Sequence, residues 1–183
     1  LGISIFSNLP VTKLIAQRLE PTLMLSLTTL IFAVVVAVPM GVIAAWKAGT
    51  WVDRLIMIFA VFGFSVPVFV VGYMMIFSFS MELGILPVQG YKSPFDDFWQ
   101  FVRHITLPTI TLSVIYIALI ARITRASMLE VLEEDYIRTA RAKGQTESRV
   151  LISHALKNAS IPIVTIIGIG IALLIGGVVV TES

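Results

Sequence analysis

Long uncharged apolar stretches alternate with shorter polar segments along this 183-residue chain. Three stretches, 22–46, 55–81 and 158–181, contain no charged residue, and a fourth runs from 105 to 121. The fourth extends to residue 128 if two arginines reach the membrane interface. A membrane-crossing helix needs about 20 apolar residues to span roughly 30 Å of hydrocarbon. The pattern predicts a single all-α transmembrane domain over 1–183, with spans near 22–46, 55–81, 105–128 and 160–181 and a polar loop at 129–159.

Composition supports a membrane location. Hydrophobic residues make up 57% of the chain and charged residues 13%, with a mean hydropathy of +0.97. A soluble domain carries about 25% charged residues. The net charge of +2 is too small to indicate a nucleic-acid partner. Cysteine is absent, and His104 and His154 are too far apart to indicate a metal cluster.

Lysine and arginine are distributed unequally between the two sides of the predicted membrane. Nine flank or fill the connection 47–54 and the loop 129–159, and four lie on the other side. Because positively charged loops tend to stay in the cytoplasm, the side with nine is predicted to be cytoplasmic. The nine are Lys47, Arg54, Arg122, Arg125, Arg138, Arg141, Lys143, Arg149 and Lys157, and the four are Lys13, Arg18, Lys92 and Arg103.

The first span carries small residues and prolines in a definite pattern. Residues 10–20 have one apolar side, which predicts a short helix on the outer membrane surface or a helical lead-in to the span. Pro21 suits the first turn of the span, and Pro39 predicts a kink or the end of a tightly packed part. Small residues at helical spacing predict a face that another helix approaches closely. They are Thr22, Ser26, Thr29, Ala33, Ala37 and Ala44.

The second span and the loop after it contain helix-breaking residues. Gly63, Pro67 and Gly72 predict a bent helix within 55–81. The external loop, 83–104, is rich in glycine and proline. Four of its aromatic side chains are expected to lie at the headgroup level of the membrane. They are Phe95, Phe98, Trp99 and Phe101.

Four polar residues share one side of the third span. At 100° per residue, Thr106, Thr109, Ser113 and Tyr116 fall within about a quarter of the helix circumference. Polar groups are costly in lipid, so this stripe should face protein or water. It either lines a translocation path or packs against another helix through hydrogen bonds.

The loop 129–159 has helical periodicity of its own. Leu129, Leu132, Tyr136 and Ala140 recur at three and four residues and form an apolar face. Acidic residues come first and basic residues last, which suits the helix dipole. Gly144 is placed to end this helix with a positive φ, and a second helix can follow, with Thr146 as its cap. Two helices joined at a glycine corner suit docking to a soluble partner, but an amphipathic loop on the lipid surface fits the periodicity equally well.

The letters of this loop carry a family resemblance. Two segments closely resemble the dipeptide and oligopeptide branch of binding-protein-dependent ABC permeases: Ser127-Met-Leu-Glu-Val-Leu-Glu-Glu-Asp-Tyr-Ile-Arg-Thr-Ala-Arg-Ala-Lys-Gly144 and His154-Ala-Leu-Lys-Asn-Ala-Ser-Ile-Pro162. Leu83-Gly-Ile-Leu-Pro87 and Gly176-Gly-Val-Val-Val-Thr-Glu182 are similar to the same branch. The wider family has Glu-Ala-Ala, three residues, Gly, nine residues and Ile-x-Leu-Pro, of which only Ala140, Gly144 and Leu156 match here. These departures are typical of the peptide branch.

The resemblance implies a bacterial or archaeal inner-membrane permease subunit, of which this chain is a fragment. The loop would be the coupling helix that enters a cleft of a cytoplasmic ATPase. The implied partners are a second permease, two ATPases and an external solute-binding protein. The implied activity is import of peptides or related small solutes by alternating access. The residues expected to couple to the ATPase are Tyr136, Arg138, Thr139, Ala140, Arg141 and Gly144.

ATP is expected to bind the partner subunits, because the sequence contains no Gly-x-x-x-x-Gly-Lys-Ser/Thr phosphate loop. We therefore expect no cofactor and no enzymatic activity in this chain. The alternative function is a secondary transporter or channel subunit that needs no ATPase. Such proteins more often carry ionisable groups within their spans, and the four apolar stretches here have none.

Overall fold

The computed structural model describes residue 2 and residues 10–181. Regular structure in this part of the chain is entirely helical, as predicted. It comprises α1 (Val11–Trp46), α2 (Trp51–Ser65), α3 (Val68–Met75), the π-helix η1 (Ile76–Glu82), α4 (Phe98–Leu132), α5 (Asp135–Ala142), the short α6 (Glu147–Arg149), the π-helix η2 (Val150–Leu156) and α7 (Lys157–Thr181).

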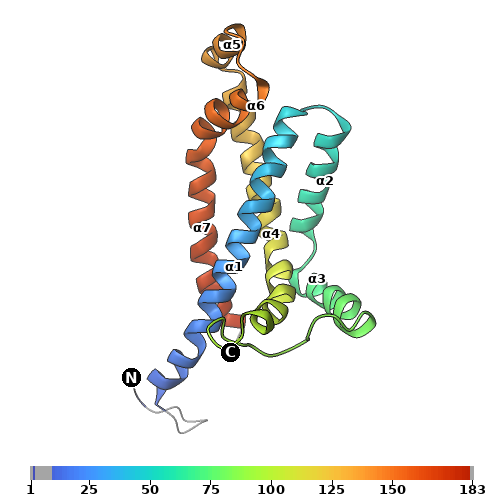
Figure 1. Ribbon diagram of the computed structural model, residues 1–183, viewed down its shortest axis with the longest axis vertical. Helices are drawn as coiled ribbons and strands as arrows, with labels where there is room; N and C mark the ends of the chain where they lie inside the picture. Colours follow the sequence, from blue (N-terminus) through green and yellow to red (C-terminus); the bar gives the residue numbers. More distant parts are fainter. Residues whose placement is uncertain (1, 3–9, 182–183) are drawn as a thin grey trace.

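Helices α1, α2, α4 and α7 run lengthwise side by side (Figure 1), and α4 contacts α1, α2, α3 and α7. The α1–α2 turn, α5 and α6 lie at one end of this bundle. The start of α1 and the loop before α4 lie at the other end. The connections predicted to share the cytoplasmic side therefore lie at one end, and the predicted external loop lies at the opposite end.

The tightest packing joins α1 to α4. The predicted face of small residues on α1 is buried from Thr22 to Ala44, with Thr29, Ala33 and Ala37 fully covered. Gly41 continues this face and was missed in the sequence, although it stands four residues after Ala37. A Cβ at Gly41 would lie 2.5 Å from the Cβ of Thr124 on α4. Glycine is therefore required at this helix crossing, where α1 and α4 approach most closely.

Helix α1 is continuous from Val11 to Trp46. Residues 11–20 therefore form a helical lead-in to the span, and a separate surface helix is not present. Pro21 lies inside α1 instead of in a first turn, and the helix also passes through Pro39. Helices in membranes tolerate interior proline because neighbouring groups satisfy the backbone atoms that proline leaves unpaired.

The second predicted span is broken instead of bent. Helices α2 and α3–η1 meet at an angle of 101°. Val66 is extended at the break (φ −84°, ψ 125°), as is usual for a residue before proline, and Pro67 precedes α3. Three described helices are long and apolar enough to cross a membrane, and the broken pair makes a fourth if both arms count as one span. Helix α2 alone, at 1.5 Å per residue, is about 22 Å long, which is shorter than the roughly 30 Å of hydrocarbon in a membrane.

Helix α4 begins at Phe98, well before the predicted start at 105. The Asp97 carboxylate caps it by accepting a hydrogen bond from the Gln100 N–H at 3.1 Å. Because this region is helical, Phe101 turns inward and is 7% exposed, with its ring edge-on to Tyr91. Phe101 therefore packs within the protein, and its depth relative to the headgroups stays a prediction. The other three aromatic residues expected there, Phe95, Phe98 and Trp99, are exposed.

Two hydrogen bonds hold the loop before α4 against the bundle. The Tyr91 hydroxyl donates to Glu20 on α1 at 3.0 Å, and Arg103 on α4 donates to the carbonyl of Ile85 at 2.9 Å. Burial, the hydrogen bond to Glu20 and the charge of Glu20 raise the pKa of Tyr91 to about 12. The phenol therefore remains protonated at neutral pH and keeps donating to α1.

Candidate functional site

The loop after α4 folds into a compact element, here called the glycine corner (residues 135–149). Helix α4 ends at Leu132, and Glu134 is extended (φ −67°, ψ 146°) before α5 starts. The single helical face predicted through Leu129, Leu132, Tyr136 and Ala140 is therefore interrupted. The apolar residues before and after the break belong to two separate helices.

Gly144 ends α5 as predicted. Its φ is +76°, in the left-handed region that glycine adopts most easily. The Gly144 N–H donates to the Arg141 carbonyl at 2.9 Å, and the Gln145 N–H donates to the Ala140 carbonyl at 3.2 Å. These two bonds form the Schellman arrangement that closes many helices. Thr146 precedes α6, as predicted, but its side chain makes no capping hydrogen bond.

An ion pair crosses the corner from α5 to α6. The Arg141 guanidinium contacts the Glu147 carboxylate at 2.7 Å, with a second hydrogen bond at 3.3 Å. Both side chains are partly exposed, so solvent weakens the pair. Its contribution is to hold α6 against α5 in one orientation, in addition to the backbone bonds at Gly144.

The inner face of α5 belongs to the core of the protein. Ile137 is fully buried and Ala140 is 8% exposed, and both lie in one buried cluster with Met128 at the end of α4. The cluster also contains Val150, Leu151 and Ala155 of η2 and Ala159 and Ile163 of α7. The expectation that Ala140 lies on the face presented to a partner is therefore wrong. Ile137 was missed, although it is the one large aliphatic residue between 135 and 142 and stands three residues before Ala140.

The outer face of α5 is aromatic and basic. Tyr136 is 42% exposed, and Arg138, Thr139 and Arg141 are exposed, as is Gly144 at the corner. Arg138 makes a weak contact of 3.4 Å with Asp135, and both side chains are largely solvated. Five of the six residues expected to couple to an ATPase therefore lie at the surface of the corner. The sixth, Ala140, supports them from beneath.

The four polar residues predicted to line a path lie in two environments. Ser113 is fully buried and its hydroxyl donates to the Ile110 carbonyl at 2.8 Å. The Tyr116 ring packs against Gly170 of α7, where a Cβ would lie 3.3 Å away. Ser113 and Tyr116 thus contact neighbouring groups of the described chain, and whether the stripe lines a path stays a prediction.

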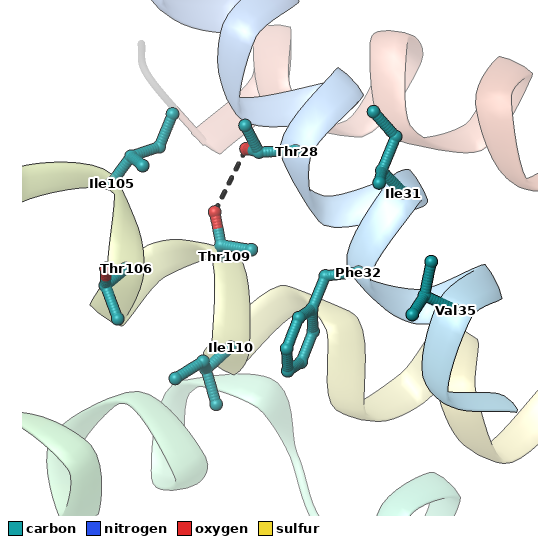
Figure 2. Close-up of a pocket in the computed structure, with 8 residues that line it drawn as sticks. All are labelled: Thr28, Ile31, Phe32, Val35, Ile105, Thr106, Thr109 and Ile110. Atoms are coloured by element: carbon teal, nitrogen blue, oxygen red, sulfur yellow. Dashed lines mark hydrogen bonds between the residues drawn. The ribbon is translucent and has the colours of Figure 1, made fainter. Parts of the chain in front are cut away.

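Thr106 and Thr109 instead border a cavity of about 400 Å³ between α1 and α4. The Thr109 hydroxyl is 3.0 Å from that of Thr28 on α1, and Figure 2 shows this contact at the cavity wall. Thr106 turns its hydroxyl back to the Val102 carbonyl. The rest of the wall is apolar and consists of Ile31, Phe32, Val35, Ile105 and Ile110.

Comparisons with known proteins agree with the resemblance in the sequence. A family model described as "Binding-protein-dependent transport system inner membrane component" matches residues 37–183. The chain is 55% identical over 182 residues to a probable peptide ABC transporter permease protein, y4tP, of Sinorhizobium fredii, covering all of this chain and 58% of that protein. It is 46% identical over 182 residues to the glutathione transport system permease protein GsiC of Escherichia coli K12, covering all of this chain and 57% of that protein.

A third relative is the dipeptide transport system permease protein DppB of Alkalihalophilus pseudofirmus. It is 39% identical over 203 aligned residues, which cover all of this chain and 61% of that protein. The chain thus spans about three fifths of the length of the relatives it matches. The family match covers most of the chain, and all three relatives are named as permeases of transport systems. The chain belongs to the family of inner membrane components of binding-protein-dependent transport systems.

Proposed function

We propose that this chain is part of a permease subunit in an ATP-driven importer of peptides or related small solutes. Family membership supports the class of protein. The printed names of the relatives, which specify peptide, glutathione and dipeptide transport, support the class of solute. The structural observation that carries the proposal is the glycine corner, which has a basic outer face and an inner face continuous with the core of the bundle.

The corner is suited to pass movement from a soluble partner to the membrane helices. A cytoplasmic ATPase would contact the exposed side of α5 through Tyr136, Arg138 and Arg141. The opposite side of α5 is packed through Ile137 into the cluster that includes Met128 of α4 and residues of α7. Packed interiors transmit displacement because they contain little free volume. Movement of α5 would therefore shift the cytoplasmic ends of α4 and α7 together.

The remaining partners are those that the family resemblance implies. A second permease subunit would enclose a path together with this chain. Thr106 and Thr109 are the path-lining candidates that border the cavity between α1 and α4. A solute-binding protein would deliver the solute at the end of the bundle that carries the loop 83–97. Two ATPases, which hold ATP, would drive the change from inward- to outward-facing.

Reconstitution tests this proposal. The full-length permease would be purified with its second permease and ATPases and inserted into proteoliposomes with the binding protein. We expect uptake of a labelled dipeptide, oligopeptide or glutathione only when ATP is supplied to the ATPase side. The matched control is a complex whose ATPase cannot hydrolyse ATP. Uptake that persists in this control, or that follows a proton gradient without ATP, would refute the proposal and favour a secondary transporter.

A further inference from the structure

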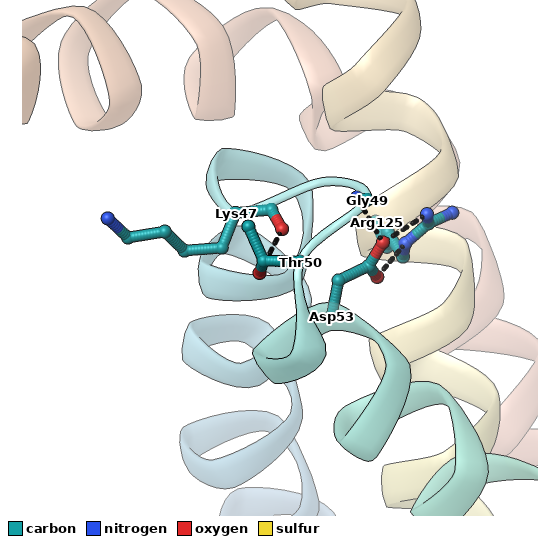
Figure 3. Close-up of polar contacts among 5 residues, drawn as sticks. All are labelled: Lys47, Gly49, Thr50, Asp53 and Arg125. Atoms are coloured by element: carbon teal, nitrogen blue, oxygen red, sulfur yellow. Dashed lines mark hydrogen bonds and ion pairs between the residues drawn. The ribbon is translucent and has the colours of Figure 1, made fainter.

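A partly buried ion pair joins the α1–α2 turn to α4. Asp53, in the first turn of α2, is 4% exposed. The Arg125 guanidinium of α4 donates from Nε to Oδ1 of Asp53 at 2.6 Å and from a terminal nitrogen to Oδ2 at 2.8 Å. The backbone N–H of Gly49 donates to Oδ2 at 2.9 Å, as Figure 3 shows. Sequence patterns do not indicate this pair, because 72 positions separate its members.

The geometry of the pair is restrictive. Two parallel hydrogen bonds between guanidinium and carboxylate fix both direction and distance, which a single contact with lysine would not do. The turn beneath it is also ordered, because Gly49 has φ +78° and the Thr50 hydroxyl donates to the Lys47 carbonyl at 2.6 Å. A buried carboxylate that loses its partner is strongly unfavourable. The start of α2 is therefore held to α4 at one defined point.

The position of this point on α4 is informative. Arg125 lies one helical turn before Met128, which belongs to the buried cluster that also holds Ile137 of α5. Successive turns of α4 thus hold the α1–α2 turn and enter the buried cluster that includes Ile137 of the glycine corner. Farther along α2, Gly63 approaches the apolar side chain of Val114, and the Arg122 guanidinium lies 6.0 Å from the centre of the Phe64 ring. Apolar contacts of this kind let helices slide past one another more readily than a forked ion pair does.

We propose that Asp53 and Arg125 are a positioning pair that makes α2 and the α1–α2 turn follow α4 when the glycine corner moves. This inference rests on the proposed transport function. Without the pair, displacement of α5 by the ATPase would still move α4. Helix α2 would not move with α4, so the spans would not change conformation together. The pair would then determine how much solute moves for each ATP hydrolysed, while the ATPases would still bind and cycle.

The test uses the full transporter in proteoliposomes and measures solute taken up per ATP hydrolysed. D53N removes one charge with little change of shape, and R125Q removes the other charge together with the guanidinium fork. We expect both to retain ATPase activity while uptake per ATP falls about tenfold, within the range usual for coupling between two sites. The double variant should be no worse than either single variant, because the pair acts as one unit. R54Q is the matched control, since it removes a neighbouring exposed charge and should leave the ratio unchanged.

A distance measurement separates positioning from a simple loss of folding. Spin labels at residues 54 and 126, both exposed, report the separation of α2 and α4. We expect this separation to stay constant between the nucleotide-free and the nucleotide-trapped complex, and to change between these states when R125Q is introduced. A separation that already changes in the unaltered complex would overturn the proposal.

Different results would refute the proposed transport function and the positioning role of Asp53 and Arg125. If the unaltered complex shows no ATP-dependent uptake, the proposed function is wrong and the positioning role falls with it. If uptake is normal and D53N and R125Q leave uptake per ATP unchanged, only the positioning role is wrong.

Discussion

Replacing Gly144 tests whether the glycine corner must keep its left-handed backbone. Nothing lies within 4 Å of the position that a Cβ would take at this residue, so a larger side chain meets no steric obstacle in the chain itself. The cost comes from the backbone alone, because φ is +76°. For an L-residue the left-handed conformation costs about 1–2 kcal/mol, and a β-branched residue is worse than alanine.

These magnitudes give a graded series. Asparagine tolerates positive φ better than other L-residues, so Gly144→Asn should have the mildest effect. Gly144→Ala should be intermediate and Gly144→Val the most severe. A cost of about 1.4 kcal/mol reduces the population of a correctly formed corner about tenfold relative to its alternatives. The rank order Gly, Asn, Ala, Val is a stronger test than any single value.

The assay is ATP-dependent uptake together with co-purification of the ATPases, measured for the full-length permease. We expect both quantities to fall along the series, with membrane insertion and binding-protein docking unchanged, since no span is altered. Full uptake by the Gly144→Val variant would show that the corner geometry is not required for coupling. An asparagine variant worse than valine would show that a partner packs directly on Gly144 and that backbone strain is not the cause.

Three further changes test the topology, the cavity and the helix crossing. Cysteines at Gln145 and Ser93 should react with an impermeant maleimide in intact cells only at Ser93, and the reverse pattern would invert the topology. A cysteine at Thr106 should react with small aqueous reagents to a degree that changes when ATP is trapped, whereas an inert cysteine would indicate helix packing. Gly41→Ala should lower the free energy of unfolding by about 1–3 kcal/mol, the usual cost of overpacking. Gly168→Ala should not lower it, since nothing lies within 4 Å of the added Cβ. Equal effects of the two substitutions would refute the close crossing of α1 and α4.

Features set by local sequence were predicted well. The buried face of α1 follows from small residues at helical spacing, and Thr29, Ala33 and Ala37 are all covered. The end of α5 at Gly144 follows from capping chemistry, which involves only neighbouring residues. The helix end depends only on neighbouring residues, and the small residues report directly which face of α1 another helix can approach, although they do not identify that helix as α4.

Features set by contacts across the fold were not predicted. Gly63, Pro67 and Gly72 indicate that a helix is interrupted, but they do not give the 101° change of direction, which depends on how α3 packs at the end of the bundle. Asp53 and Arg125 each carry a charge near a span end, and hydropathy alone cannot indicate that they pair. The inward direction of Ala140 also depended on tertiary contacts, because the interruption before α5 changed which residues share a face.

The burial of Ala140 changes the meaning of an obvious test of coupling. Ala140→Asp would place an unpaired carboxylate in the cluster with Ile137 and Val150, at a cost of several kcal/mol. We therefore expect it to lower the thermal stability of the purified permease even without ATPases, so a loss of uptake in this variant would not identify a contact.

Tyr136→Ala is the informative change, because the side chain is 42% exposed on the outer face of α5. Surface substitutions usually alter stability by less than about 0.5 kcal/mol, so the isolated permease should melt normally. Loss of an aromatic anchor at an interface commonly costs about 2 kcal/mol or more, so retention of the ATPases should fall by more than tenfold. The two variants together separate contact from support. If Ala140→Asp melted normally but released the ATPases, α5 would have to expose its inner face in the assembled transporter, and its link to α4 through Ile137 could not carry the movement.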